Sequence, residues 1–228
     1  RHKGDHRSAE KRPGAPYRIG EQLMQEKEII IASNNEGKVA EIRDLFSDLP
    51  FTVLSLKDVG AEINIVEDQP DFAGNSLKKA RETSLITGSI ALADDSGLEV
   101  DALGGKPGVL SARFAGEHAT DQENNCKLLD MMNGIEESKR SARFRCVVTM
   151  YFPDGYYLQA EGTCHGRIGF SPRGSSGFGY DPLFVVDVYG KTMAELSMQE
   201  KNAISHRSQA LKALKKLLET ESRLMIHR

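Results

Sequence analysis

The sequence predicts an α/β fold, in which a sheet of mixed strands is flanked by helices. Two short apolar runs, at residues 28–32 and 90–93, have the length and composition of buried strands. Apolar residues at helical spacing follow the first run, beginning at Val39. The stretch 142–165 has the pattern of a β-hairpin and is expected to form a second lobe.

Length and composition are those of an ordinary globular protein. The 228 residues are 28 % charged and 39 % hydrophobic, and the net charge of −3 gives no general attraction to nucleic acid. No apolar run approaches the roughly 18 residues that a membrane span requires. Cys126, Cys146 and Cys164 are odd in number and widely spaced, so neither a disulfide framework nor a zinc site is expected. These features predict a cytoplasmic protein that uses neither a membrane nor nucleic acid as its partner.

The two ends of the chain are expected to lie outside the folded domain. Residues 1–27 are rich in Arg, Lys, His, Gly and Pro and predict a disordered tail or an added segment. A basic arm that contacts nucleic acid is the less favoured alternative. We expect residues 28–220 to form a single two-lobed domain and residues 221–228 to form a C-terminal tail.

The first unit is a strand, a polar loop and a helix. The strand 28–32 leads into the loop 33–38, and the helix continues until Pro50 stops it. Such a loop directs backbone amides and a helix N-terminus at one point, where an anion can bind, and Lys38 adds a positive charge. The alternative, held equally open, is plain helix capping by Ser33 or Asn34.

The next segment contains an acidic loop between strands and a helix. Strands are expected at 51–56 and 63–66, and a helix at 73–87. The acidic residues of the loop 67–71 could supply a metal ligand. On sequence alone, their favourable interaction with the helix N-terminus is the preferred explanation.

Two adjacent carboxylates, Asp94 and Asp95, follow directly after the apolar run 90–93. We expect them at the end of that strand, where ligands gather in sheets flanked by helices. There they could hold a hard divalent cation, which prefers oxygen ligands and commonly accompanies phosphates. The alternative is a polar turn in which Asp and Ser side chains bond backbone amides.

The central part of the chain predicts loops, one helix and the hairpin. A glycine-rich loop covers 104–108, and a capping box at 120–123 begins a helix that runs through Met132. The hairpin pairs 142–152 with 156–162 across a Pro-Asp-Gly turn.

Two arginines, Arg143 and Arg145, lie two residues apart and so share one face of the first hairpin strand. A solvated or salt-bridged face is the expected role of this pair.

The last third combines a flexible aromatic loop with a long helix. Loop 173–182 offers glycines and a stacking surface for a planar ring, and a strand follows at 183–187. A capping box at 197–200 begins the last helix, on which Lys201 and Ser205 are expected on the polar side and the pair His206 and Arg207 on a solvated face. The apolar stripe of that helix comprises Ile204, Leu211, Leu214, Leu217 and Leu218.

Five local motifs, each ambiguous alone, occur in an order that resembles the inosine/xanthosine triphosphate pyrophosphatase family. They are SNNEGK at 33–38, ADDSGL at 93–98, LGGKPGVLSAR at 103–113, GFGYDP at 177–182 and ISHR at 204–207. The resemblance covers about residues 28–220 and is closer to the bacterial members. It implies hydrolysis of deaminated purine nucleoside triphosphates, such as dITP, ITP and XTP, to a monophosphate and pyrophosphate. It also implies a homodimer and an elongated α/β fold whose two lobes enclose a nucleotide-binding cleft.

The resemblance also implies a set of site residues. Asp95 would be the general base and a Mg²⁺ ligand, with Ser96 beside it contacting substrate. The triphosphate would be held by Ser33, Asn34, Asn35, Glu36, Gly37 and Lys38. The nucleoside wall would comprise Phe178, Gly179, Tyr180 and Asp181, and Lys201, His206 and Arg207 would complete the site.

One stretch departs from the family pattern. Relatives often carry Glu-Glu-Thr-Gly-x-Thr-Phe before a Glu-Asn-Ala helix start, whereas this chain reads VEDQPDF at 66–72 and GNS at 74–76. Glu67 is the best remaining candidate for a second metal ligand, with its register uncertain by one residue.

The expected mechanism is activation of water by a carboxylate while Mg²⁺ binds the phosphates. Asp94 is expected to orient Asp95 or to lie beyond the direct metal ligands. A donor from Arg207, or from amides near Phe178, would favour the 6-oxo group of hypoxanthine and xanthine over the amino group of adenine.

Two alternatives stay open. One is a pyrophosphatase for other modified or pyrimidine triphosphates, although the Ser-x-Ser-Pro-Arg-Arg-like opening of the septum-inhibitor-like family is absent. The other is a non-catalytic module that binds nucleotide or nucleic acid.

Overall fold

The computed structural model describes residues 28–49 and 51–226, with side chains described as far as residue 220. The predicted tail 1–27 lies outside the described residues. None of the helices in the described part is both long and apolar enough to cross a membrane.

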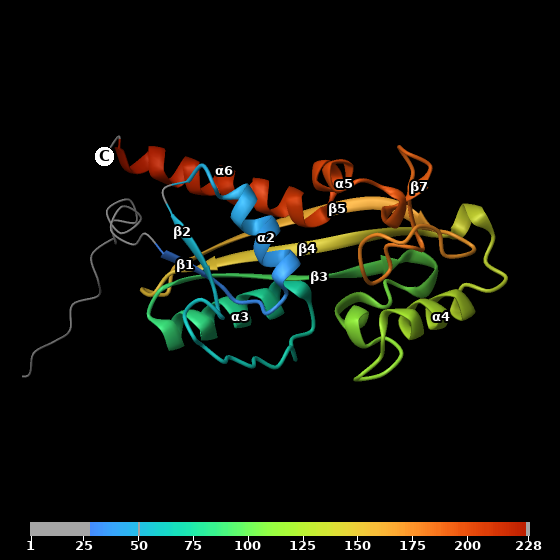
Figure 1. Ribbon diagram of the computed structural model, residues 1–228, viewed down its shortest axis with the longest axis horizontal. Coiled ribbons are helices and arrows are strands. Elements are labelled where there is room, and N and C mark those ends of the chain that lie inside the picture. Colours follow the sequence, from blue (N-terminus) through green and yellow to red (C-terminus); the bar gives the residue numbers. More distant parts are fainter. Residues whose placement is uncertain (1–27, 50, 227–228) are drawn as a thin grey trace, which may run out of the picture.

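A single seven-stranded mixed sheet forms the centre of the protein (Figure 1), in the order β2-β1-β3-β4-β5-β6-β7. The strands β2, β1 and β3 are parallel, and all later neighbours are antiparallel. The strands are β1 (Glu28–Ile31), β2 (Thr52–Ser55), β3 (Ile90–Val100), β4 (Ser141–Tyr151), β5 (Tyr157–Ile168), β6 (Phe184–Val186) and β7 (Lys191–Thr192).

Helices cover both faces of the long strands. The α-helices are α2 (Glu36–Leu45), α3 (Phe72–Thr87), α4 (Asp121–Met131), α5 (Met198–Ile204) and α6 (His206–Ile226). In Figure 1, α6 lies above β4 and β5, whereas α3 lies below β3 and β4. Alternate residues of a strand point to opposite faces, so Val148 packs in the core beneath α6 while Thr149 bonds Ser76 of α3.

Two hydrophobic cores lie at the two ends of this long sheet. One joins α2 and α6 to β1 and the near half of β3, with Phe46 and Leu92 among its fully buried residues. The other joins α4 and β6 to the far half of β3, with Leu98 and Phe184 at its centre. The predicted elongated, two-lobed α/β fold is therefore confirmed, with both lobes built on one sheet.

Most predicted elements are present near their predicted bounds. Two exceptions lie before residue 90. No strand forms at 63–66, because this segment pairs with none of the described strands. The helix after the first loop is capped by Asn35 and neither Ser33 nor Asn34, since the Asn35 side chain accepts a bond from the Lys38 amide, 3.1 Å away.

The aspartate pair was predicted at the end of a short strand, which is wrong. Strand β3 has 11 residues, and Asp94 and Asp95 lie in its interior. The reason is its pairing with β4, which runs without interruption from Ala91 to Val100. The hairpin likewise does not form a lobe of its own, because β4 and β5 are the central strands of the common sheet.

The last helix is interrupted, contrary to prediction. Ser205 has an extended backbone (ψ 146°) that separates α5 from α6, and its hydroxyl accepts the amide of Ser208 as a new cap. This break buries Arg207, which was expected to lie on a solvated face. Helix α6 continues to Ile226, so most of the predicted tail 221–228 is helical.

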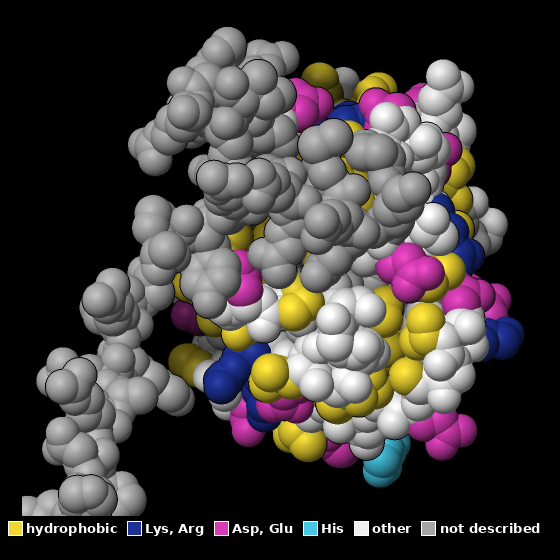
Figure 2. Space-filling model, turned by 90° about the vertical axis from the view of Figure 1, so that its left-hand side faces the viewer, with side chains coloured by type: hydrophobic (Ala, Val, Ile, Leu, Met, Phe, Trp, Pro, Cys, Tyr) yellow, Lys and Arg dark blue, Asp and Glu magenta, His cyan; other side chains and the backbone are white. Residues whose placement is uncertain are grey.

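The part of the molecular surface that is not covered by grey atoms in Figure 2 shows no large patch of one charge. Hydrophobic, acidic and basic side chains alternate over its visible part. The three cysteines are free thiols, of which Cys126 is exposed and Cys146 and Cys164 are buried.

Candidate active site

Strand β3 directs its two adjacent aspartates to opposite faces of the sheet. Successive strand residues alternate in direction, so Asp94 points toward α2 and α6 while Asp95 points toward α3. Both lie just beyond the carboxyl end of β1, where the Ala32 amide bonds the Leu92 carbonyl at 2.8 Å. The loop that leaves β1 therefore starts beside the pair, as the predicted anion loop requires.

Asp94 is buried between two cations. Its Oδ2 accepts from Lys38 Nζ at 2.9 Å and from Arg207 Nε at 3.2 Å. The Arg207 guanidinium is held from its other side by Glu41, with Nη1 and Oε2 2.7 Å apart. Burial alone would raise the pKa of Asp94, but the charges of Lys38 and Arg207 outweigh it and hold that pKa well below its usual range.

Asp95 has a less completely paired environment. Its Oδ2 accepts from Asn75 Nδ2 at 3.0 Å, and Lys79 Nζ lies 3.7 Å from Oδ1. Lys79 forms its close ion pair with Glu67 instead. Burial, assisted by the negative charge of Glu67, raises the pKa of Asp95 to about 6. This carboxyl therefore has the proton affinity of a group suited to accept a proton near neutral pH.

The acidic loop 67–71 places Glu67 next to Lys79 and directs Asp68 away from the site. Asp68 pairs with Lys78 at 2.8 Å, whereas Glu67 contacts Lys79 beside Asp95. Burial would lower the pKa of Lys79, but the charges of Asp94, Asp95 and Glu67 raise it, so this amine stays protonated. Among the described residues, no three His, Cys, Asp or Glu side chains gather in a group that could hold a metal ion by themselves.

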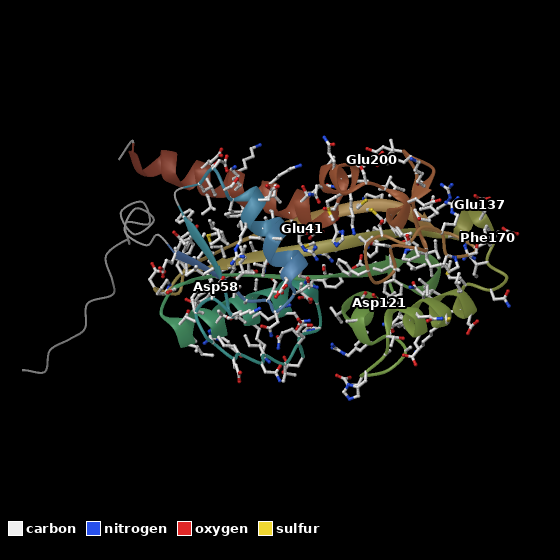
Figure 3. The ribbon with its side chains drawn as sticks, viewed as in Figure 1. Glu41, Asp58, Asp121, Glu137, Phe170 and Glu200 are labelled. Carbon is white, nitrogen blue, oxygen red and sulfur yellow. The ribbon has the colours of Figure 1, made fainter. Side chains whose placement is uncertain are left out.

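Three site residues were missed at the sequence level: Asn75, Lys79 and Glu41. The first two lie four apart on α3 and so share the helix face that packs on β3. Polar residues at this spacing on an otherwise buried face are the signal that could have identified them. Glu41 lies three residues after Lys38 on α2, which gives it the same direction toward the sheet. Figure 3 labels Glu41 on this helix.

A cavity of about 290 Å³ lies at the carboxyl end of β1. Two lysines, Lys38 and Lys79, line it together with Asp94. Its remaining lining includes the loop residues Ser33, Asn34 and Asn35 and the acid Glu67. Asp94 and Glu67 offset the charges of the two ammonium groups, so the attraction for an anion comes mainly from the N-terminus of α2, which begins beside this loop.

The other two residues of the predicted phosphate loop behave differently. Glu36 is almost fully exposed and pairs with Lys57 at 3.3 Å, so it does not join the Lys38–Asp94 cluster. Gly37 lies in the first turn of α2, close to the side chain of Asn35.

The glycine of the Asp-Asp-Ser-Gly motif has a packing role. A Cβ on Gly97 would lie 2.5 Å from both the Gly108 carbonyl and the Ser111 hydroxyl. The Ser111 hydroxyl also accepts the Leu98 amide at 2.9 Å. The absence of a side chain thus lets the 108–113 segment lie directly on β3. Ser96, on the same strand, is half-buried, and its amide bonds Asp95 Oδ1 at 3.1 Å.

The predicted nucleoside wall forms a tight turn in the second lobe. Asp181 is buried and accepts from Lys201 Nζ at 2.6 Å and from the Phe178 amide at 3.2 Å. Tyr180 is buried, and its hydroxyl donates to the Ser111 carbonyl at 2.8 Å. Phe178 alone leaves its ring half exposed, with Lys201 Nζ 5.2 Å from the ring centre. An exposed aromatic ring on an anchored turn can stack on a planar ligand.

His206 is a neutral, half-buried ring next to Arg207. It stacks on Phe144 at a centroid distance of 5.0 Å, and its Nδ1 has no hydrogen-bond partner among the described residues. Burial, with the nearby Arg207 charge, lowers the pKa of His206 to about 3. Arg143 and Arg145 form the predicted salt-bridged face, with Glu99 and Glu161.

Comparison with known proteins identifies close relatives over most of the chain. A sequence model of the Ham1 family matches residues 29–217. The dITP/XTP pyrophosphatase of Desulforamulus reducens is 49 % identical over 199 residues, which are 87 % of this chain and 98 % of that protein. The dITP/XTP pyrophosphatase of Geobacter sulfurreducens is 50 % identical over 82 % of this chain and 94 % of its own length.

Solved structures agree with these sequence matches. The Ham1 protein of Staphylococcus aureus superimposes with a TM-score of 0.79 at 40 % identity, covering 86 % of this chain and all of that one. A nucleoside-triphosphatase, or dITP/XTP pyrophosphatase, of Mycobacterium abscessus gives a TM-score of 0.70 at 42 % identity, over 82 % of this chain and 98 % of that one.

Proposed function

Since the chain belongs to the Ham1 family, we propose that it hydrolyses deaminated purine nucleoside triphosphates to the monophosphate and pyrophosphate. The observation that carries this proposal is the cavity lined by Lys38, Lys79 and Asp94. Lys79, one of the two lysines that would bind a triphosphate there, has its Nζ 3.7 Å from Oδ1 of Asp95, a carboxyl whose pKa suits a general base.

Asp95 takes the proton of the attacking water in this proposal. Asn75 and Lys79 hold the carboxylate in place, and Lys79 also offsets negative charge on the phosphates. Lys38 and the N-terminus of α2 stabilise the charge that develops on the leaving pyrophosphate. The anhydride linkage between the α- and β-phosphates is hydrolysed: water supplies an oxygen to one of its two phosphorus atoms, and the other phosphorus keeps the bridging oxygen.

Magnesium dependence is a further part of the proposal. Glu67 and Asp95 both approach Lys79, so negative oxygen ligands gather at one place, which suits a hard divalent cation. Two carboxylates leave most coordination positions to waters and substrate phosphates, as Mg²⁺ commonly requires. When bound, the ion would neutralise phosphate charge during hydrolysis.

The contribution of Glu67 to Mg²⁺ binding can be tested by comparing a Glu67 variant with a variant of the adjacent Asp68. Glu67→Gln is expected to raise the Mg²⁺ concentration for half-maximal activity severalfold, because it removes one anionic ligand. Asp68→Asn is the matched control, since Asp68 pairs with Lys78 and should leave that concentration unchanged. Equal Mg²⁺ requirements in Glu67→Gln and the wild type would contradict the assignment.

Selectivity for a 6-oxo purine is assigned to Arg207. The amides of Phe178 and Gly179 already donate to Asp181 and Asp121, so they are less available than the sequence suggested. Arg207 uses Nε and Nη1 for Asp94 and Glu41. Its remaining donors match a 6-oxo acceptor and leave adenine with a donor facing a donor.

The first test is pyrophosphate release from dITP compared with ATP and GTP, each with and without Mg²⁺. Fast, Mg²⁺-dependent release from dITP alone is the expected result. Equal rates of release from dITP, ATP and GTP would support the pyrophosphatase reaction but contradict the proposed selectivity for deaminated purines. Activity only on pyrimidine triphosphates would favour the first alternative. Binding without any release would favour the non-catalytic module, which the net charge of −3 makes unattractive as a nucleic-acid binder.

The homodimer and the cytoplasmic location stay predictions from the family resemblance and the sequence. Light scattering coupled to size-exclusion chromatography measures the oligomeric state directly, and cell fractionation measures the location.

A further inference from the structure

The turn that carries Phe178 is attached to helix α4 through one residue, Gly179. The Gly179 amide donates to Asp121 Oδ2 at 2.6 Å, and its carbonyl accepts from Asn125 Nδ2 at 2.8 Å. Both side chains lie four apart on α4, so they face the turn together. Gly179 has a φ of +59°, a conformation that few other residues adopt readily.

This attachment fixes the position of the Phe178 ring. The turn is closed by the Asp181 amide, which donates to the Phe178 carbonyl at 3.2 Å. The ring itself is 52 % exposed and packs into neither hydrophobic core. Its position therefore depends on the backbone of the turn and hence on the contacts of Gly179.

Helix α4 is itself firmly held in the fold, so it can fix the position of the turn that carries Phe178. A capping box between Thr120 and Glu123 fixes its first turn, where Asp121 lies. Asn124, which is buried, bonds the Ala112 carbonyl and the Ala115 amide, so the helix also holds the segment that covers β3. Figure 3 labels Asp121 at the start of α4.

We propose that Asp121 is a positioning residue for nucleobase binding, acting through Gly179 on the Phe178 ring. This inference rests on the proposed function and deepens it. Asp121 is exposed and belongs to neither core, so its removal should leave the fold intact. Asn125 supports the same glycine from its carbonyl side.

The test compares ligands that contain a base with one that does not. Asp121→Ala should raise the KM for dITP about tenfold, the scale of losing a hydrogen bond to a charged group. Inhibition by the product dIMP should weaken by a similar factor, whereas inhibition by pyrophosphate, which has no base, should stay unchanged. The kcat should change little, because the groups around Asp95 are untouched.

Two variants serve as controls. Asp121→Asn keeps an oxygen acceptor and should restore most of the dIMP affinity. Asp130→Ala removes a negative charge from the same helix at an exposed position and should behave as the wild type.

The outcomes separate this inference from the proposed function. A wild-type protein that releases no pyrophosphate from dITP contradicts the proposed function itself. An active wild type whose Asp121→Ala variant keeps its KM and its dIMP inhibition overturns the positioning role. Equal weakening of dIMP and pyrophosphate inhibition would also overturn it, since that would indicate a general structural effect.

Discussion

The two faces of strand β3 give two neighbouring aspartates different environments. Asp94 lies between Lys38 and Arg207, and its charge is fully offset. Asp95 receives a hydrogen bond from Asn75 and lies at a longer distance from Lys79, which pairs more closely with Glu67. The same residue type therefore has a strongly lowered pKa on one face and a pKa of about 6 on the other.

This difference assigns separate tasks to the pair. A carboxylate bound to two cations orients them and is a poor proton acceptor. A carboxylate with incomplete pairing keeps its proton affinity and has free oxygen positions for water or a metal ion. Asp94 thus fits a positioning role for Lys38 and Arg207, and Asp95 fits the chemical step.

The largest expected effect is on the Asp95 face. Asp95→Asn keeps the shape but removes the proton acceptor, so we expect turnover of dITP to fall at least about a thousandfold. Circular dichroism and the urea unfolding midpoint should stay close to those of the wild type. Pyrophosphate release measures the effect, and a near-normal rate would contradict the assignment of the base.

A second effect is expected on the Asp94 face, this time on stability. Asp94→Asn leaves the buried Arg207 and the half-buried Lys38 without their shared anion, so the free energy of unfolding should fall by about 3 kcal/mol. Urea denaturation measures this change. Asp48→Asn, which removes an exposed ion pair with Lys215, is the control and should cost much less. A similar loss in both variants would show that the two faces of β3 do not differ as described.

The sequence predicted the fold class and most elements, because strand and helix periodicity are local signals. It placed the aspartate pair at the end of a strand, since polar residues in a strand interior have no local signature. The pairing of β3 with β4 across residues 91–100 overrides that signal through contacts distant in sequence.

The candidate site, like the fold, was predicted in part from the sequence. Lys38 was predicted from the polar loop after the first strand, and Glu67 and Arg207 from the comparison with the family pattern; the structure brings all three near the aspartate pair. Lys79 and Asn75 were missed: their four-residue spacing marks a polar face on α3, but it does not indicate which strand residues that face contacts. The catalytic and binding roles of these residues stay predictions until the variants above are measured.

The smallest expected effect again concerns the Asp95 face. Thr83 lies one turn after Lys79 on α3, is fully buried and lines the 290 Å³ cavity. Its hydroxyl has no hydrogen-bond partner among the described residues, which is costly for a buried polar group. Thr83→Val preserves the shape without the hydroxyl, so the free energy of unfolding should rise by about 1 kcal/mol. Urea denaturation measures this change in the free energy of unfolding, and Thr83→Ser, which keeps the hydroxyl, should not gain stability.

A loss of stability in Thr83→Val would mean that the Thr83 hydroxyl is hydrogen-bonded in solution. The face that carries Asp95 would then be as fully paired as the face that carries Asp94.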